Sequence, residues 1–377
     1  MTRPIRVLQI TRGAIDGGFD FYREISHAFA GDAFHVTTVF SRGALPQEEI
    51  HRYVGDVVFL DAKNRWRFRQ RWFVALKLWS MNRRETFDLA ICHHHKPAVA
   101  VNTLNRLGTV GRMYFVVHDF DYFNENTTHG PRRRKFVLNE LDPGCTFIAV
   151  SEAMRRNILQ CLPELDPQRC IVIPNAIDDV QLEVDRLDRE TARKALGADR
   201  NTFVFGTVGR LVPYKAHDEL IQAYAQIHDR LPDSRLVIIG RGKSRDRLTA
   251  QIREAGLEHK IALIGFLPKA ARYMAAFDVF VFPSHNEPFG LVLLEAMVNR
   301  LPILAADSGA VPEIVPNADA LFQTGDINAL ATRLLEIYRM PAAARQALGE
   351  LGYQHLQRHF SLEHYRDCYR ALWDDAS

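Results

Sequence analysis

Short apolar segments alternate with helical patterns along the whole of this 377-residue chain, and this alternation constrains the fold more than any other feature. Apolar runs of about 4–8 residues between turn signals are typical of strands buried on both faces, and intervening helices favour parallel sheets. The candidate strands of the first half are Ile5–Ile10, His35–Phe40, Asp56–Leu60, Asp88–Cys92, Met113–Val117, Phe147–Val150 and Ile171–Ile173. Those of the second half are Thr202–Val208, Arg235–Ile239, Ile261–Phe266, Val279–Phe282, Ile303–Ala306 and Ala320–Phe322.

The two series are separated by a charged stretch, 178–200, that has no strand signal. Each series opens with a strand followed by glycines, at 13–18 in the first half and 206–209 in the second, as two Rossmann-like units would. The sequence therefore predicts an α/β protein with two Rossmann-like parallel-sheet domains facing each other across a cleft. We expect the domains over 1–177 and 178–352, with an aromatic helical tail over 353–377.

Composition agrees with a globular protein, since 47% of the residues are hydrophobic and 25% are charged. The five cysteines are scattered and form no C-x-x-C pair, so neither a disulfide framework nor a zinc site is indicated. The first strand begins too early for a signal peptide, and no run of about 18 apolar residues occurs. We therefore expect a cytoplasmic location.

The most informative local segment is 279–297, which combines a buried strand, a loop and a helix that opens at Phe289-Gly290. This helix is apolar nearly all round, so Glu295 is anomalous. It lies four residues after Leu291 and hence one turn below the free N–H groups of the helix start. Helix-start amides attract phosphate or sugar oxygens, and a carboxylate below them can accept hydrogen bonds from a ribose diol. The segment predicts a sugar-nucleotide site; the alternative is that Glu295 pairs with Arg300 or another base.

The spacing of Glu287 and Glu295 resembles the Glu-x7-Glu signature of the retaining, GT-B-fold glycosyltransferases of family 4. Four further segments match landmarks of that family in the right order: Ser151-Glu152-Ala153-Met154, Ile173-Pro174-Asn175-Ala176-Ile177, Val208-Gly209-Arg210-Leu211 with Lys215, and Ser308-Gly309-Ala310-Val311-Pro312-Glu313. The matches span about half of the chain. The resemblance implies a transferase that builds lipopolysaccharide core or another surface glycan.

The resemblance also implies roles for individual residues. The catalytic set is His118, which lies against the donor sugar, Arg210 and Lys215, which neutralise the diphosphate, and Glu287, which holds sugar hydroxyls. The donor-binding set is Gly17, Gly18, Phe289, Gly290, Leu291 and Glu295, the last of these on the ribose. We expect no cofactor and no metal, because two fixed cations and the helix-start amides can carry the charge and no Asp-x-Asp tripeptide is present. One departure from the family pattern is Ala216, where glycine usually follows the lysine.

Other motifs allow a structural and a functional interpretation. His118 alone is compatible with a structural role. His93-His94-His95 also ends a strand, but no carboxylate or cysteine keeps ligand spacing with it, so an acceptor-facing loop fits better than a metal site. Gly240-Arg241-Gly242 lacks the third glycine of a dinucleotide fingerprint.

The first domain is the basic one, since residues 1–177 hold 24 Lys and Arg against 18 Asp and Glu. Its centre, 63–84, has eight basic residues and no acid, and Phe68, Trp72, Leu76 and Trp79 share one helical face. This stripe is either the core side of a crossover helix or a membrane-surface helix that meets anionic headgroups. Nucleic acid is not expected as a partner, because the net charge is only +3 and no binding module appears.

The sequence therefore predicts a retaining, metal-independent hexosyltransferase whose donor is a nucleotide-diphosphate sugar, with UDP-hexose the expected form. The acceptor would be a growing cell-surface glycan or glycolipid such as lipopolysaccharide core, and the enzyme would sit in the cytoplasm or peripherally on the cytoplasmic face of the inner membrane. Three alternatives stay open: a sugar-phosphate acceptor, as in disaccharide-phosphate synthesis, a glycan-binding protein with a vestigial site, and a dinucleotide oxidoreductase. The intact Glu287/Glu295 and Arg210/Lys215 pairs argue against loss of catalysis.

Overall fold

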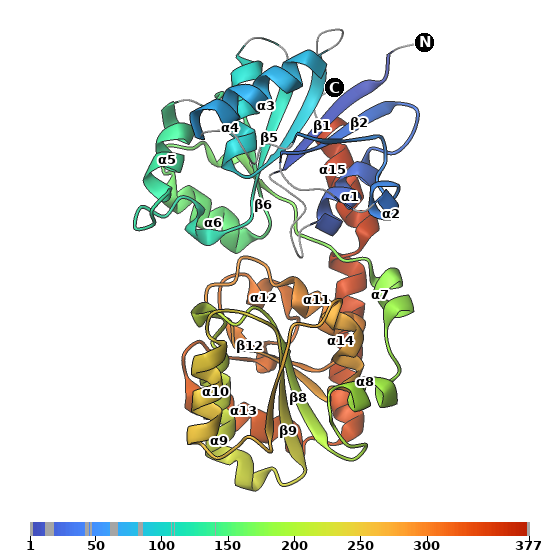
Figure 1. Cartoon of the computed structure of the whole chain (residues 1–377), viewed down its shortest axis with the longest axis vertical. Helices are drawn as coiled ribbons and strands as arrows, with labels where there is room; N and C mark the ends of the chain where they lie inside the picture. Colours follow the sequence, from blue (N-terminus) through green and yellow to red (C-terminus); the bar gives the residue numbers. More distant parts are fainter. Residues whose placement is uncertain are drawn as a thin grey trace. The chain divides into compact units, whose positions relative to one another are not determined.

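The computed structural model describes residues 3–11, 19–41, 45, 47–60, 67–81, 86–106, 108, 110–139 and 141–374, without the side chains at 19–20, 67–72 and 95–96. The chain forms two compact units (Figure 1). The first consists of Met1–Asn175 with Leu362–Ser377, and the second of Ala176–Ser361. Each unit is built on a parallel sheet with helices on both faces, which confirms the predicted α/β class.

The sheet of the first unit has seven strands in the order β3-β2-β1-β4-β5-β6-β7. Their bounds are β1 Ile5–Thr11, β2 Phe34–Phe40, β3 Asp56–Phe59, β4 Phe87–His93, β5 Val110–Val117, β6 Thr146–Ala149 and β7 Cys170–Val172. The order reverses between β1 and β4, and such a switch point is where parallel sheets bind ligands, outside the carboxyl ends of the strands.

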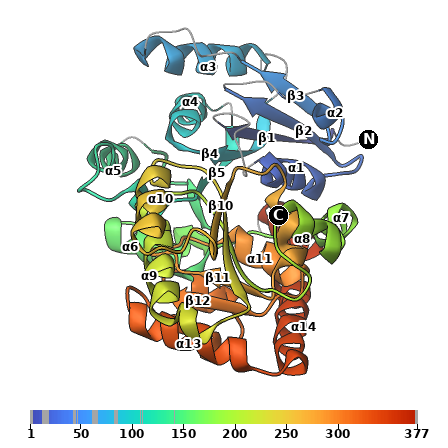
Figure 2. The same ribbon diagram turned by 60° about the horizontal axis from the view of Figure 1, so that its bottom comes forward.

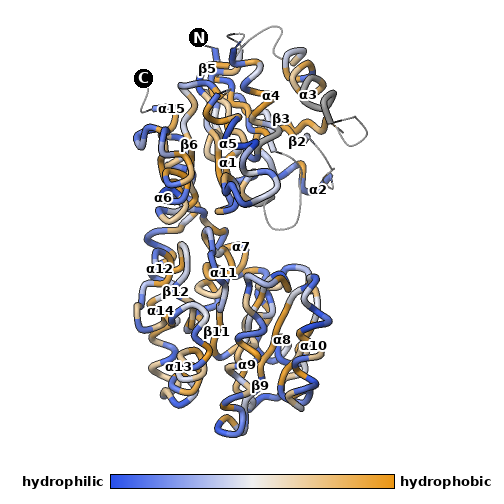
Figure 3. Tube along the Cα trace, turned by 90° about the vertical axis from the view of Figure 1, so that its left-hand side faces the viewer, coloured by the Kyte–Doolittle hydropathy of each residue, from blue (hydrophilic) through white to orange (hydrophobic). Residues whose placement is uncertain are grey.

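The sheet of the second unit has six strands in the order β10-β9-β8-β11-β12-β13, with its switch point between β8 and β11. Their bounds are β8 Phe203–Val208, β9 Ser234–Ile239, β10 Ile261–Gly265, β11 Val279–Phe282, β12 Ile303–Asp307 and β13 Leu321–Gln323. All four residues of β11 are buried, as a strand covered on both faces requires. The strands run as hydrophobic segments between more hydrophilic turns (Figure 3).

Helices cover both faces of each sheet. Those of the first unit are α1 Phe19–Ala28, α2 Gln47–Ile50, α3 Arg67–Met81, α4 His95–Asn105, α5 Gly130–Asn139, α6 Glu152–Cys161 and α15 Leu362–Asp374. Those of the second are α7 Asp179–Asp185, α8 Arg189–Ala195, α9 His217–Ile227, α10 Arg245–Glu254, α11 Leu291–Val298, α12 Val311–Ile314, α13 Ile327–Arg339 and α14 Ala342–His359. In the second unit α9, α10 and α13 share one face, while α11 and α14 pack together on the other (Figures 1 and 2).

The domain limits differ from the expected ones at the tail. We expected the tail to begin at residue 353, whereas α14 runs through that position, packs against α11 and belongs to the second unit. Only α15 joins the first unit, where Arg366 contacts Glu24 and Arg370 donates to the carbonyl oxygen of Ala28 at 2.9 Å. The charged stretch 178–200 is not a bare linker but forms α7 and α8 within the second unit.

The predicted strand Thr202–Val208 and the predicted glycine turn at 206–209 overlap at Gly206, and the structure places this residue inside β8. A Cβ atom at this position would lie 2.2 Å from the ring of Phe277, so the glycine allows that ring to pack directly on the strand. Glycines at 240 and 242 have a similar role, because Cβ atoms there would lie 1.8 Å and 2.2 Å from the carbonyl oxygens of Gly209 and Leu211. They let the loop after β9 approach the loop that carries Arg210.

The basic helix α3 packs against α4. Val74, Ala75 and Leu78 are buried, whereas Leu76 and Trp79 are 60% and 41% exposed. The interpretation of the aromatic stripe as core is therefore wrong for these two residues, and the side chains of Phe68 and Trp72 lie outside the described part. No helix among the described residues is both long and apolar enough to cross a membrane.

Candidate active site

Two loops at the carboxyl edge of the second sheet carry five of the ten predicted site residues: Arg210, Lys215, Glu287, Phe289 and Gly290. One follows β8 and passes through a 3-10 turn, Pro213–Lys215, into α9; the other follows β11 and ends where α11 begins. β8 and β11 pair directly in the sheet. The two loops therefore leave the sheet side by side at its switch point, where ligands of such sheets bind.

Lys215 and Glu287 form an ion pair that joins these loops. The Lys215 ammonium donates to Oε2 of Glu287, and the Ser284 hydroxyl donates to the same oxygen at 2.9 Å. Glu287 is only 8% exposed, so the two donors offset the cost of burying its carboxylate. Its second oxygen makes no hydrogen bond within the described part of the chain and is left as an acceptor for a ligand hydroxyl.

Two more contacts fix the relative position of the loops. The backbone N–H of His285 donates to the carbonyl oxygen of Tyr214 at 2.7 Å, and the His285 ring lies 3.0 Å from a carboxylate oxygen of Glu219 on α9. Sequence reasoning missed Ser284, Tyr214 and His285 as site residues. Their only signal in the sequence is that they lie next to the motif residues.

Arg210 is the exposed cation of the site. Its guanidinium contacts the Tyr214 hydroxyl and lies 5.7 Å from the centre of the Tyr214 ring, while Nζ of Lys215 lies 5.5 Å from the same centre. The tyrosine ring thus lies close to both cations. Two cations held near one another at a strand end suit an anionic ligand such as a diphosphate.

Ala216 follows Lys215 in the left-handed conformation, with φ 48° and ψ 35°, and is 1% exposed. This conformation costs little for glycine but is strained for a residue with a Cβ atom. The departure from the family pattern therefore puts backbone strain directly after the lysine.

The start of α11 has the features expected of an anion site. Gly290 is the N-cap residue with φ 91°, and no side chain caps the first turn, so the backbone N–H groups of Leu291 and Val292 have no capping partner in the helix. Phe289 contributes only its backbone to the region around the start of α11. Its ring is buried and packs edge-on against Phe360, with ring centres 5.8 Å apart.

Glu295 lies one turn below these amides, as predicted, but it is half-buried rather than fully buried. Of the alternative pairings, the one with Arg300 does not occur, and a pairing with another base stays open. The Arg300 guanidinium instead contacts Glu183 at 2.8 Å and Glu350 at 3.5 Å, and lies over the ring of Tyr353.

The first unit brings histidines together at the carboxyl ends of β4 and β5, which pair in the sheet. Nδ1 of His93 lies 3.1 Å from Nε2 of His118, and the two rings stack at 20° with centres 5.4 Å apart. Burial, and secondly His94, lower the pKa of His118 to about 3. Burial, then His118 and His94, hold the pKa of His93 well below its ordinary value. Both rings are therefore neutral at pH 7.

His94 precedes α4 with φ 71° and ψ 155°, a backbone region that residues other than glycine rarely occupy. Such a conformation costs about 1–3 kcal/mol and is typical of functional sites. The side chain of His95 and both Gly17 and Gly18 lie outside the described residues, so the glycine-loop prediction stays a prediction. Among the residues that are described, no three His, Cys, Asp or Glu side chains are grouped as metal ligands would be.

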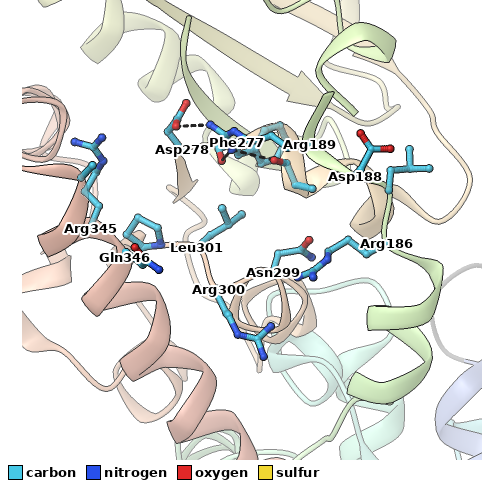
Figure 4. Close-up of a pocket in the computed structure, with 14 residues that line it drawn as sticks. Arg186, Asp188, Arg189, Phe277, Asp278, Asn299, Arg300, Leu301, Arg345 and Gln346 are labelled. Atoms are coloured by element: carbon cyan, nitrogen blue, oxygen red, sulfur yellow. Dashed lines mark hydrogen bonds and ion pairs between the residues drawn. The ribbon is translucent and has the colours of Figure 1, made fainter. Parts of the chain in front are cut away.

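A pocket of about 610 Å³ lies at the opposite, amino edge of the second sheet, next to the residues that precede β11 and β12. Four arginines line it, at positions 186, 189, 300 and 345 (Figure 4). Arg189 is already paired with Asp278, and the guanidinium groups of Arg300 and Arg345 point away from one another. The arginines therefore do not converge on one anion, and the pocket holds none of the predicted site residues.

Two family models match the chain, one in each half. Residues 15–181 match Glycosyltransferase Family 4, and residues 188–355 match Glycosyl transferases group 1. These ranges contain all the predicted site residues.

Curated relatives and solved structures agree with the family models. The chain is 32% identical over 210 residues to a D-inositol 3-phosphate glycosyltransferase of Corynebacterium glutamicum, covering 52% of this chain and 50% of that protein. It is 27% identical over 270 residues to an Escherichia coli UDP-Gal:alpha-D-GlcNAc-diphosphoundecaprenol alpha-1,3-galactosyltransferase, covering 70% and 69%. The match to the first of these relatives thus spans about half of its length. The fold resembles that of Anabaena HepE, solved with UDP and glucose, with TM-score 0.81, 20% identity and coverage of 98% and 100%.

Proposed function

Because the chain belongs to the GT-B-fold glycosyltransferases of family 4, we propose that it transfers a hexose, with retention of configuration, from a nucleotide-diphosphate sugar. The proposed donor is a UDP-hexose, and the proposed acceptor is a growing cell-surface glycan or glycolipid such as lipopolysaccharide core. The observation that carries the proposal is the Lys215–Glu287 pair, which joins the loop that holds Arg210 to the loop that leads into the uncapped start of α11.

Cleavage of a sugar–diphosphate bond builds negative charge on the leaving group and positive charge on the sugar. Arg210, Lys215 and the backbone N–H groups of α11 would stabilise the leaving diphosphate, since fixed donors aimed at developing charge need no reorganisation during the reaction. The two protein cations would then neutralise the diphosphate, a role that a metal ion has in other transferases. On this account, turnover requires no divalent metal.

The two glutamates would bind the sugar and the ribose. Oε2 of Glu287 is engaged by Lys215 and Ser284, so its other oxygen would accept from a sugar hydroxyl. Glu295, one turn into α11, would accept from the ribose diol. Retention would follow if the acceptor attacks on the face from which the diphosphate leaves, without a covalent intermediate.

The lipid-linked acceptor named for the Escherichia coli relative supports a membrane-bound acceptor, and so do the exposed Leu76 and Trp79 on the basic helix α3. We propose that α3 contacts anionic lipid from the cytoplasmic side. The inositol phosphate named for the Corynebacterium relative supports the second candidate, a sugar-phosphate acceptor.

The test is a panel of nucleotide sugars, measured first by thermal stabilisation and then by transfer of labelled sugar to membranes or to sugar phosphates, with and without EDTA. We expect UDP and one UDP-hexose to raise the Tm, and transfer to continue in EDTA. Stabilisation by none of the nucleotides contradicts the proposed donor. Loss of turnover in EDTA that Mg²⁺ or Mn²⁺ restores contradicts metal independence.

A further inference from the structure

We infer that His93 is a positioning residue that fixes the ring of His118 through a hydrogen bond between the two imidazoles. The inference rests on the proposed function and on the place against the donor sugar that the family resemblance implies for His118. His93 has no exposed surface, so it does not touch a ligand itself, and its contact with His118 is its route to one.

The ring of His93 is held from several directions. It ends β4, where it pairs with Val116 of β5, and Nδ1 lies 3.1 Å from Nε2 of His118. The ring of Tyr22, on α1, meets it edge-on with centres 4.8 Å apart. Rotation of His93 would break the contact with His118 and disturb this packing. Nε2 of His118 is therefore held at a fixed point at the edge of the first sheet.

Two neutral imidazoles share a hydrogen bond only when one donates an N–H and the other accepts. Both rings are neutral at pH 7, for the reasons given above. They must then adopt complementary tautomers. Since Nε2 of His118 is used in this bond, Nδ1 is the ring nitrogen of His118 that remains for a substrate.

The surroundings of His93 select one of the two arrangements. Nε2 of His93 is buried and has no hydrogen-bond partner in the part of the chain that the structure describes. Buried N–H groups without a partner are rarer than buried acceptors without one, which favours a bare Nε2 and a proton on Nδ1. His93 then donates to His118, and His118 carries its own proton on Nδ1, where it donates to an oxygen of the sugar.

Three substitutions separate this role from packing. His93→Asn places an amide near the position of Nδ1, His93→Gln places the same amide near that of Nε2, and His93→Phe keeps a ring without the hydrogen bond. We expect kcat within about threefold of the parent for His93→Asn and about tenfold lower for the other two. UDP affinity, measured by calorimetry, should not change, because the inference gives His93 a role only at the sugar, and Arg210, Lys215 and Glu295, proposed to bind the diphosphate and the ribose, lie in the second unit.

A purely structural role predicts the reverse order of kcat, with His93→Phe more active than His93→Asn, because phenylalanine fills the space whereas asparagine leaves a cavity. That order, or equal kcat in all three variants, overturns the inference. If a variant fails to fold, ¹⁵N-edited spectra of the parent decide: we expect the His118 proton on Nδ1, and a proton on Nε2 overturns the assignment. A parent that neither binds UDP nor transfers sugar contradicts the proposed function, whereas an active parent with the wrong order contradicts only this inference.

Discussion

Lys215 and Glu287 are joined by an ion pair that links the loop after β8 to the loop after β11. The lysine side chain is 13% exposed and the glutamate side chain 10%, so water screens the pair little. The pair therefore places the cation and the carboxylate of the proposed site before any ligand arrives, and its two members depend on each other.

Lys215→Met should lower the free energy of unfolding by about 1–3 kcal/mol, because it leaves a buried carboxylate with one donor fewer. Adding Glu287→Gln should recover part of the stability and none of the turnover. Chemical denaturation and transfer assays measure both. The matched control is the exposed pair Arg333–Glu336 on α13, where Arg333→Met should cost less than about 1 kcal/mol. Equal costs at the two pairs would contradict the coupling.

Glu295→Gln should weaken UDP binding by about 1.5–3 kcal/mol, the range for a hydrogen bond to a charged group, and hence by roughly ten- to hundredfold. Lys215→Ala and Arg210→Ala should act mainly on turnover. Calorimetric titration with UDP measures the affinity. Glu350→Gln is the control, because Glu350 lies on α14 and contacts Arg300. Unchanged UDP affinity in the Glu295 variant would show that this residue does not bind the ribose.

Ala216→Gly should raise the free energy of unfolding by up to about 1 kcal/mol, because glycine adopts φ 48° without strain. Ala216→Val should lower it, since a β-branched residue suits this conformation least. Thermal unfolding of the two variants measures the effect. A stability loss in the glycine variant would mean that the methyl group contributes more by packing than the backbone strain costs.

The strand pattern of both sheets was predictable because a strand buried on both faces, such as β11, must be apolar throughout. Contacts between distant segments were not predictable from the sequence. No local sequence signal predicts that Lys215 pairs with Glu287 or that His93 meets His118, because these contacts arise only when β8 pairs with β11 and β4 with β5. Gly206 fitted both a strand and a turn in the sequence, because a glycine needed for packing looks the same in sequence as one needed for a turn.

The same limit explains the error at α3. Its sequence offers two apolar faces, one with the large residues Leu76 and Trp79 and one with the smaller Val74 and Ala75. Hydrophobicity favours the first as core, whereas close packing on α4 selects the second. The choice depends on the neighbouring helix, which periodicity within α3 does not reveal.

The exposed side of α3 should bind anionic vesicles, and the binding should fall steeply with salt because it depends on screened charges. Changing Arg67, Arg69 and Arg71 together to Gln, or Leu76 and Trp79 to Ser, should reduce co-sedimentation and leave UDP affinity unchanged. Leu351→Ser is the control, since Leu351 is an exposed leucine of α14 in the other unit. If the triple Arg→Gln variant and the double Ser variant both sediment with vesicles as well as the parent does, α3 no longer supports a membrane-bound acceptor.

The central claim is retaining transfer from a UDP-hexose at the site built by Arg210, Lys215 and Glu287. Proton NMR of UDP-hexose turnover, followed from the first minutes, tests it most directly, because it reports the anomeric configuration of the sugar before it equilibrates in water. We predict that the first sugar released or transferred is the α anomer, and that Glu287→Gln abolishes the signal. A first-formed β anomer, or turnover that survives Glu287→Gln unchanged, would contradict the account.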